Sequence, residues 1–358
     1  MKKEKTAITI AGIIIGLIAV MLVYFGNPAN MGFCIACFLR DTSGALGLHS
    51  AAAVQYIRPE IIGLVIGSCI VALATKEFAP RGGSAPVTRF ILGFFVMIGC
   101  LMFLGCPFRM ILRLAGGDLN ALAGLAGFAA GIFAGVFFLN RGYTLKRSYK
   151  MQKLEGFVFP VVQLVFLVLL AVAPSFIHFT EEGGGPGAKH AAIAISLAAG
   201  IIVGVLAQRT RLCMVGGIRD AILFGESKLL MGFVAITVSA LIGNFILGAV
   251  TGTPLVNFAM AGQPVAHTDA LWNALGMLLA GFGCVLLGGC PLRQLILSGE
   301  GNTDSVMAVI GLMVGAAFCH NFGLASSGEG PTANGKIAVI IGLIVVTTIA
   351  VINSRQDD

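Results

Sequence analysis

Two motifs that join a thiol to an arginine recur in the two halves of the chain. Gly-Cys-Pro-x-Arg occurs at 105–109 and again at 289–293. Earlier in each half, a cysteine precedes an Arg-Asp pair by six residues. These positions are Cys34 with Arg40-Asp41, and Cys213 with Arg219-Asp220. The matched motifs lie 179 and 184 residues apart, so the spacing indicates an internal duplication.

The residue types in these motifs suit the handling of an anion. Proline lacks an N–H group and disfavours helix at the residue before it, so Cys106 and Cys290 are expected where a new helix begins. A helix N-terminus attracts anions and favours thiolate. An arginine inside a membrane points to a pathway or to a partner. The four arginines concerned are Arg40, Arg109, Arg219 and Arg293.

Each of these arginines has two possible roles. One is to position an anion, and the other is to brace the helix break through an ion pair with a nearby aspartate. Arg40 and Arg219 would pair with the aspartate that follows each of them. Arg109 and Arg293 would pair with Asp118 and Asp304.

The composition excludes a soluble protein. The 358 residues are 57% hydrophobic and 11% charged, whereas a soluble domain carries about 25% charged residues. Many apolar runs reach the roughly 17–25 residues that cross a bilayer. The net charge of +7 comes from basic residues in short loops, which is typical of membrane topology rather than of nucleic-acid binding.

The apolar runs predict ten membrane spans in an all-α polytopic protein. They are expected at 7–25, 58–75, 89–105, 119–139, 157–178, 190–207, 229–250, 270–288, 304–321 and 336–353. The first is interpreted as a retained span rather than a signal peptide. Four apolar stretches are too short to span, and all carry the cysteine motifs: 31–48, 106–115, 209–224 and 290–298. They are predicted to be re-entrant or half-helices.

The distribution of basic residues predicts the orientation. The loop 140–156 carries five Lys or Arg residues, whereas 251–269 carries none. The positive-inside rule therefore places both termini in the cytoplasm. Five spans in each half would insert the halves in opposite orientations, as inverted repeats. The expected units are a first repeat at 1–156, a connecting span and exterior loop at 157–189, and a second repeat at 190–358.

Other cofactor chemistry finds little support in the sequence. Cys34 and Cys37 form a C-x-x-C pair, which by itself fits a redox dithiol, a metal pair or packing. A zinc site is not expected, because there is no second such pair and the five histidines are scattered. No nucleotide-binding motif, metalloprotease motif or nucleophile elbow is present, so no cofactor is predicted.

At these motifs the chain resembles the YeeE/YedE family of bacterial sulfur-compound membrane transporters. The resemblance extends over essentially the whole chain, and the stretch Gly32-Phe33-Cys34-Ile35-Ala36-Cys37 is similar to the YedE branch, which is associated with selenium metabolism. It implies an hourglass-like fold of inverted repeats in the bacterial cytoplasmic membrane. It also implies uptake of a small sulfur- or selenium-containing anion, which is thiosulfate in the better-known branch.

In that family, thiols line a narrow central path and pass the substrate along by S–H hydrogen bonds, without covalent turnover. The positions that match are Cys34, Cys106 and Cys290, with Cys37 and Cys213 as additional thiols. A cytoplasmic sulfur or selenium carrier protein is a candidate partner. No enzyme activity is expected. Two rival functions remain, a membrane thiol–disulfide oxidoreductase that uses Cys34 and Cys37, and a metal-ion permease with soft thiol ligands.

Overall fold

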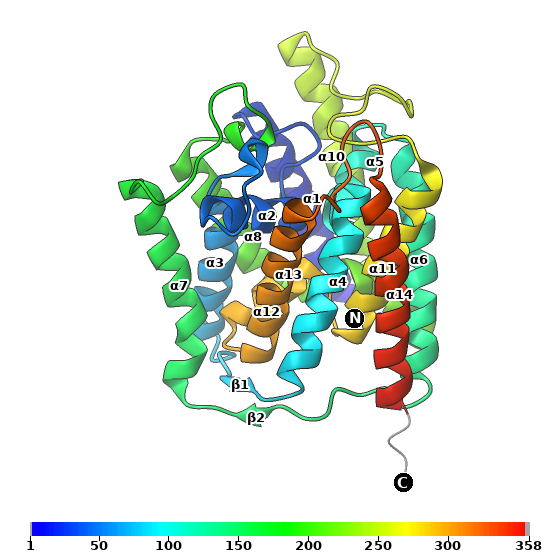
Figure 1. The fold of residues 1–358 in the computed structure, drawn as a ribbon. Coiled ribbons are helices and arrows are strands. Elements are labelled where there is room, and N and C mark those ends of the chain that lie inside the picture. The colour runs from blue at the N-terminus through cyan, green and yellow to red at the C-terminus, as the bar shows by residue number, and fades with distance from the viewer. Residues whose placement is uncertain (1, 355–358) are drawn as a thin grey trace.

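The computed structural model describes residues 2–354 and is almost entirely helical (Figure 1). Its α-helices are α1 (Lys2–Tyr24), α2 (Ile35–Ala45), α3 (Pro59–Ala74), α4 (Pro86–Phe103), α5 (Pro107–Ala115), α6 (Asn120–Leu139), α7 (Lys153–Val172), α8 (Ile193–Thr210), α9 (Met214–Phe224), α10 (Lys228–Thr251), α11 (Ala270–Leu286), α12 (Pro291–Gly299), α13 (Thr303–Asn321) and α14 (Ala333–Ser354). Two short 3-10 turns, η1 (Ala52–Val54) and η2 (Pro186–Ala188), lie in connecting segments. Strands β1 (Arg81–Gly82) and β2 (Tyr149–Lys150) pair antiparallel.

The prediction of ten spans is confirmed. Ten segments of the described chain are long and apolar enough to cross a bilayer. The four short apolar stretches are also helical, and each forms a helix of nine or eleven residues. At 1.5 Å per residue such a helix covers only about half of a hydrocarbon core of roughly 30 Å. They are half-helices, as the sequence predicts.

The order of helix lengths repeats along the chain. Long, short, long, long, short, long, long describes both α1–α7 and α8–α14. The helix contacts follow the same correspondence between the two halves. Helix α1 packs on α10, and its counterpart α8 packs on α3, the counterpart of α10. Likewise α4 packs on α13, and its counterpart α11 packs on α6, the counterpart of α13. This arrangement is consistent with two inverted repeats that interlock.

The connecting segments gather at two ends of the bundle. One end, called the basic end here, contains β1, β2, the loop 140–152 and the end of α14 (Figure 1). The start of α1 and the start of α10 meet there, since Lys5 donates to Ser227 at 3.3 Å. The loops 174–192 and 252–269 lie at the opposite end (Figure 1). The segments predicted to face the cytoplasm are therefore on the same side of the bundle.

Glycines allow the long helices to approach closely. On α3, a Cβ at Gly63 or Gly67 would collide with the backbone of α8. On α6, a Cβ at Gly127 or Gly131 would collide with the backbone of α11. Small residues at such contacts let helices pack where lipid offers no hydrophobic driving force. These two helix pairs form part of the frame that positions the half-helices.

Gly67→Val is expected to destabilise this frame. The added side chain must push α8 away from α3, and overpacking of this kind costs about 1–3 kcal/mol. Ala74→Val, on the exposed end of the same helix, is the matched control and should leave stability nearly unchanged. Thermal unfolding in detergent would measure both. Equal midpoints for the two variants would contradict the close α3–α8 contact.

Candidate functional site: paired thiols at four helix ends

Each half-helix begins directly after a cysteine. Cys34 caps α2, Cys106 caps α5, Cys213 caps α9 and Cys290 caps α12, and the backbone of all four cysteines is extended. Pro107 and Pro291 occupy the first position of their helices, where the missing N–H group costs nothing. The prediction that the cysteines lie at helix breaks is confirmed.

The four thiols differ in how they are held. The Sγ of Cys34 accepts a hydrogen bond from the backbone N–H of Cys37 at 3.3 Å. The Sγ of Cys213 accepts one from the N–H of Gly216 at 3.4 Å. Cys106 and Cys290 make no such capping bond to their own helices. Their sulfur atoms are therefore available to groups outside the helix.

The structure brings these thiols together in two pairs. Cys34 lies close enough to Cys106 for the two thiols to interact, and this is called the first thiol pair. Cys213 lies close enough to Cys290 for the two thiols to interact, and this is called the second thiol pair. Cys37 joins the first pair, since its sulfur lies 2.7 Å from that of Cys34. Each pair combines the two half-helices of one half of the chain.

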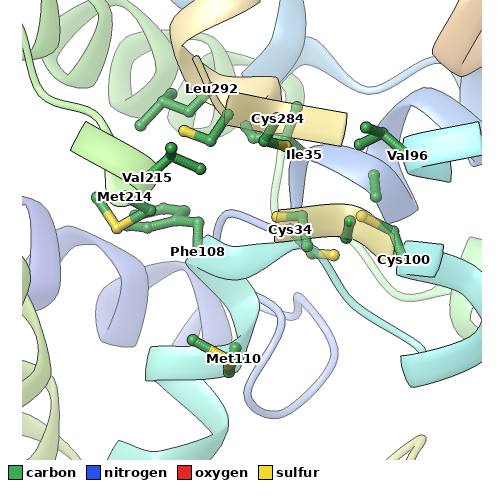
Figure 2. Packing of buried hydrophobic residues seen from close by; sticks show 14 of the residues in the cluster. Cys34, Ile35, Val96, Cys100, Phe108, Met110, Met214, Val215, Cys284 and Leu292 are labelled. Carbon is green, nitrogen blue, oxygen red and sulfur yellow. The ribbon is translucent and has the colours of Figure 1, made fainter. Parts of the chain in front are cut away.

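The half-helices of the first half of the chain also contact those of the second half. Contacts join α2 with α12, and α5 with α9. Around the thiols lie four apolar side chains, Ile35, Phe108, Met214 and Leu292, each at most 1% exposed (Figure 2). Each is the first or second residue of its half-helix. The thiols thus lie in a closed apolar centre, and a path through it requires these side chains to move.

Two further cysteines lie in this centre. Cys100 on α4 and Cys284 on α11 are fully buried and within electrostatic range of each other (Figure 2). Cys100 also lies within range of Cys34, and Cys284 within range of Cys213. Within residues 2–354, no group of three or more His, Cys, Asp or Glu side chains is arranged so that it could hold a metal ion.

Arg40 and Arg219 brace their helices, as one of the two predicted roles requires. Arg40 contacts Asp41 at 2.7 Å, and both side chains are buried. Arg219 contacts Asp220 at 2.8 Å and is about one quarter exposed. Asp41 also accepts from Arg58, which the sequence analysis did not single out. The sequence feature that could have identified Arg58 is its place at the start of an apolar span.

The predicted partners of Arg109 and Arg293 are wrong. Asp118 pairs instead with Arg113, at 2.6 Å, because Arg113 is one helical turn closer to the end of α5. Arg293 pairs with Glu300, at 3.2 Å, at the end of its own half-helix. The carboxylate of Asp304 instead accepts from the backbone N–H of Ser84.

Within residues 2–354, Arg109 makes no ion pair with a carboxylate, although it is fully buried. Its guanidinium donates only to backbone carbonyls, those of Asn30, Leu104, Pro264 and Val265. A buried charge is costly unless it is paired and hydrogen-bonded. Arg109 therefore leaves uncompensated positive charge beside the first thiol pair.

A cavity of about 830 Å³ lies at the end of the bundle opposite the basic end, and its lining includes Pro264 and Val265, whose carbonyls accept from Arg109. It is called the vestibule here, and it is lined by residues from three loops: 26–29, 182–190 and 264–265. Arg109 holds the carbonyls of the third loop, and Arg58 holds those of Pro186 and Lys189 in the second. Val265 has φ +49°, a strained conformation for a β-branched residue.

The basic end is closed by a network of exposed ion pairs. Arg211 contacts both Glu300 at 3.4 Å and Glu77 at 3.1 Å, and Arg209 contacts Glu77 at 3.3 Å. The amide of Gln208 donates to Glu77, and with these arginines it lowers the pKa of the Glu77 carboxyl below its ordinary value. The ion pairs of Glu77 are therefore formed at pH values above the ordinary pKa of a glutamate carboxyl, and they weaken as the pH falls below that pKa.

The second half of the chain matches a known family. Residues 209–353 match the family model described as sulphur transport. The matched region contains the second thiol pair and the Arg293 motif, and it supports the resemblance to the YeeE/YedE family. No curated protein matches the chain.

Asp118→Asn is expected to lower the free energy of unfolding by about 3–5 kcal/mol, because it leaves the buried Arg113 without its counter-ion. Glu77→Gln is the control at an exposed ion pair, with an expected loss of about 0–1 kcal/mol. Chemical denaturation in detergent would measure both. Similar losses for the two variants would show that the buried Arg113–Asp118 ion pair stabilises the protein no more than an exposed ion pair does.

Proposed function

We propose that this protein is a membrane transporter that imports a small sulfur- or selenium-containing anion. The observation that carries the proposal is the meeting of four half-helix N-termini, each capped by a cysteine, in two thiol pairs. The sulphur transport match to residues 209–353 supports the substrate class. The ten apolar spans support a location in a membrane, and the bacterial cytoplasmic membrane is the proposed one.

The chemistry of the site suits a soft anion in transit. A divalent oxoanion is prohibitively costly in hydrocarbon unless donors replace its water. Weak S–H donors and helix N-termini replace water partly, and they still allow the ion to leave. In this mechanism Cys34 and Cys106 would receive the anion, and Cys290 and Cys213 would pass it on. The thiols act as neutral hydrogen-bond donors, because thiolates would repel the anion.

Arg109 would select the sign of the charge at entry. An anion in the vestibule competes with the carbonyls of Pro264 and Val265 for the guanidinium. Charged acceptors bind arginine more strongly than neutral carbonyls do. Release of these carbonyls would free the third loop of the vestibule and relieve the strained Val265. The anion would then meet Cys34 and Cys106.

The finer assignment follows the resemblance to the YedE branch. A selenium species is the proposed substrate, with thiosulfate as the substrate of the better-known branch. Cys37 supports a softer substrate, because it adds a third thiol in contact with the first pair. A cytoplasmic sulfur or selenium carrier protein would receive the imported atom at the basic end.

One observation favours a second function, a membrane thiol–disulfide oxidoreductase. Cys34 and Cys37 lie in contact, both are free, and both are fully buried. Their burial argues against ready exchange with a soluble partner, because exchange needs access to the sulfur. Cycling of this pair between dithiol and disulfide, without uptake of any anion, would establish the oxidoreductase instead.

Cys106→Ala and Cys290→Ala are each expected to abolish uptake without preventing insertion. Each variant removes the thiol that is free of capping bonds in its pair. Cys69→Ala is the matched control, since Cys69 is buried on α3 and belongs to neither thiol pair. Uptake into proteoliposomes and folded yield would be measured for all three. Normal uptake in both test variants would exclude the relay of thiols.

The substrate is tested by comparing selenite, selenide, thiosulfate and sulfate in the same proteoliposomes. Selenium uptake that exceeds thiosulfate uptake is the expected result for the selenium branch. Uptake of thiosulfate alone would retain the mechanism and change the substrate. Uptake of none of the four would contradict the transport function.

A further inference from the structure

A buried carboxyl near the vestibule is incompletely bonded. Glu60, the second residue of α3, is fully buried. Its Oε1 accepts from Asn27 Nδ2 at 2.8 Å and from Ser196 Oγ at 3.0 Å. Its Oε2 has no hydrogen-bond partner among the described residues. Nearly all buried polar atoms are bonded, so such an atom requires an explanation.

The neighbours of Glu60 provide no direct counter-ion. On its own segment, Arg58 is bonded to Asp41 and to the carbonyls of Pro186 and Lys189. Tyr56 lies within electrostatic range of Glu60, and its buried OH group also has no partner among residues 2–354. The ring of His190 stacks on Tyr56 at 4.0 Å. The contacts from α8 and from the α1–α2 loop are the neutral Ser196 and Asn27.

The buried charges around the first thiol pair explain why a carboxyl is present. Four buried arginines lie in this half of the bundle: Arg40, Arg58, Arg109 and Arg113. Asp41 and Asp118 pair with three of them. Glu60 is the third buried carboxyl of this region and the one without an ion pair. When ionised, it offsets part of the excess positive charge.

One short segment connects Glu60 to the anion path. Asn27, which donates to Glu60, begins a turn whose Asn30 carbonyl accepts from Arg109 at 3.3 Å. The same turn ends at Cys34. This turn therefore links the Glu60 carboxyl to both anion contacts, and little water screens charges inside the protein. An anion at Arg109 and Cys34 would therefore repel an ionised Glu60.

We propose that Glu60 takes up a proton when an anion occupies the first thiol pair, so that anion and proton load together. The proton would come from water on the vestibule side and would bind the unpartnered Oε2. No bond other than this O–H bond forms, and no electrons are transferred. A proton on Glu60 also offsets part of the negative charge of the bound anion. The inference rests on the proposed transport function.

A proton fits this site better than a metal ion does. Ca²⁺ takes six to eight oxygen ligands, and Mg²⁺ demands octahedral geometry. Here two oxygen atoms, Glu60 Oε2 and the Tyr56 OH, lack partners among the described residues. The oxygen of Asn27 is already used by the N–H of Ala191 at 2.8 Å. A single acceptor is sufficient for a proton.

Binding of thiosulfate to the purified protein tests the linkage, with proton uptake measured by calorimetry in buffers of different ionisation enthalpy. The wild type is expected to bind at most one proton for each thiosulfate. Its affinity for thiosulfate should rise by at most about tenfold for each unit by which the pH is lowered. Glu60→Gln keeps an oxygen for Asn27 and Ser196 but cannot take up the proton. It should bind thiosulfate with no proton uptake. Glu329→Gln, at an exposed carboxyl that does not line the vestibule, is the matched control.

Infrared difference spectra between the thiosulfate-bound and the thiosulfate-free protein give a second readout. Binding should produce the C=O band of a buried carboxylic acid in the wild type, and Glu60→Gln should lack this band. Thiosulfate binding to the wild type without this band would overturn the proton site. Thiosulfate binding without proton uptake would overturn the linkage and leave transport intact. If none of selenite, selenide, thiosulfate and sulfate binds, the transport function and the linkage are both overturned.

Discussion

Helix N-termini that end inside a bundle are the constraint on which this structure depends. Each leaves several backbone N–H groups without intrahelical partners, and hydrocarbon offers none. Four such ends occur here, and the chain treats them in two ways. Cys34 and Cys213 each supply a sulfur acceptor, whereas Cys106 and Cys290 are each followed by a proline that removes one donor. The result is an interior that is rich in donors and favourable to an anion.

The two ends of the bundle handle arginine differently. At the vestibule end, Arg109 and Arg58 donate to loop carbonyls, and Arg109 contacts no carboxylate within residues 2–354. At the basic end, Arg211, Arg219 and Arg293 each contact a carboxylate and are partly exposed. In the proposed import, an anion would meet uncompensated positive charge on entry and paired charge on exit. Its attraction to the protein would then be strongest at the vestibule end.

In the proposed mechanism the thiols would complement these charges, because neutral thiols offer hydrogen bonds without a fixed charge. A row of arginines alone would bind an oxoanion too tightly for it to leave. Neutral S–H groups would weaken the hold and suit sulfur and selenium, which are soft atoms. The buried apolar side chains Ile35, Phe108, Met214 and Leu292 would keep the centre dry between passages. Selectivity and closure would thus be combined in the first turns of the half-helices.

Much of this architecture follows from the sequence. The repeated Gly-Cys-Pro-x-Arg motif, with proline after cysteine, determined that two half-helices begin at Cys106 and Cys290, because proline restricts the backbone locally. Hydrophobic length determined the ten spans, since a bilayer fixes how many residues must be apolar. The Arg40-Asp41 and Arg219-Asp220 pairs are also local, because adjacent residues need no tertiary structure to meet.

Only the tertiary structure decided which groups from distant segments meet. It placed Cys34 beside Cys106 and Cys213 beside Cys290. It also paired Asp118 with Arg113 rather than with Arg109. It also placed Glu60 against Asn27 and Ser196, which are 33 and 136 residues away in sequence. The physical reason is that these contacts depend on how helices rotate and cross. That geometry is set by the glycine-mediated packing of long helices against one another, and no single segment encodes it.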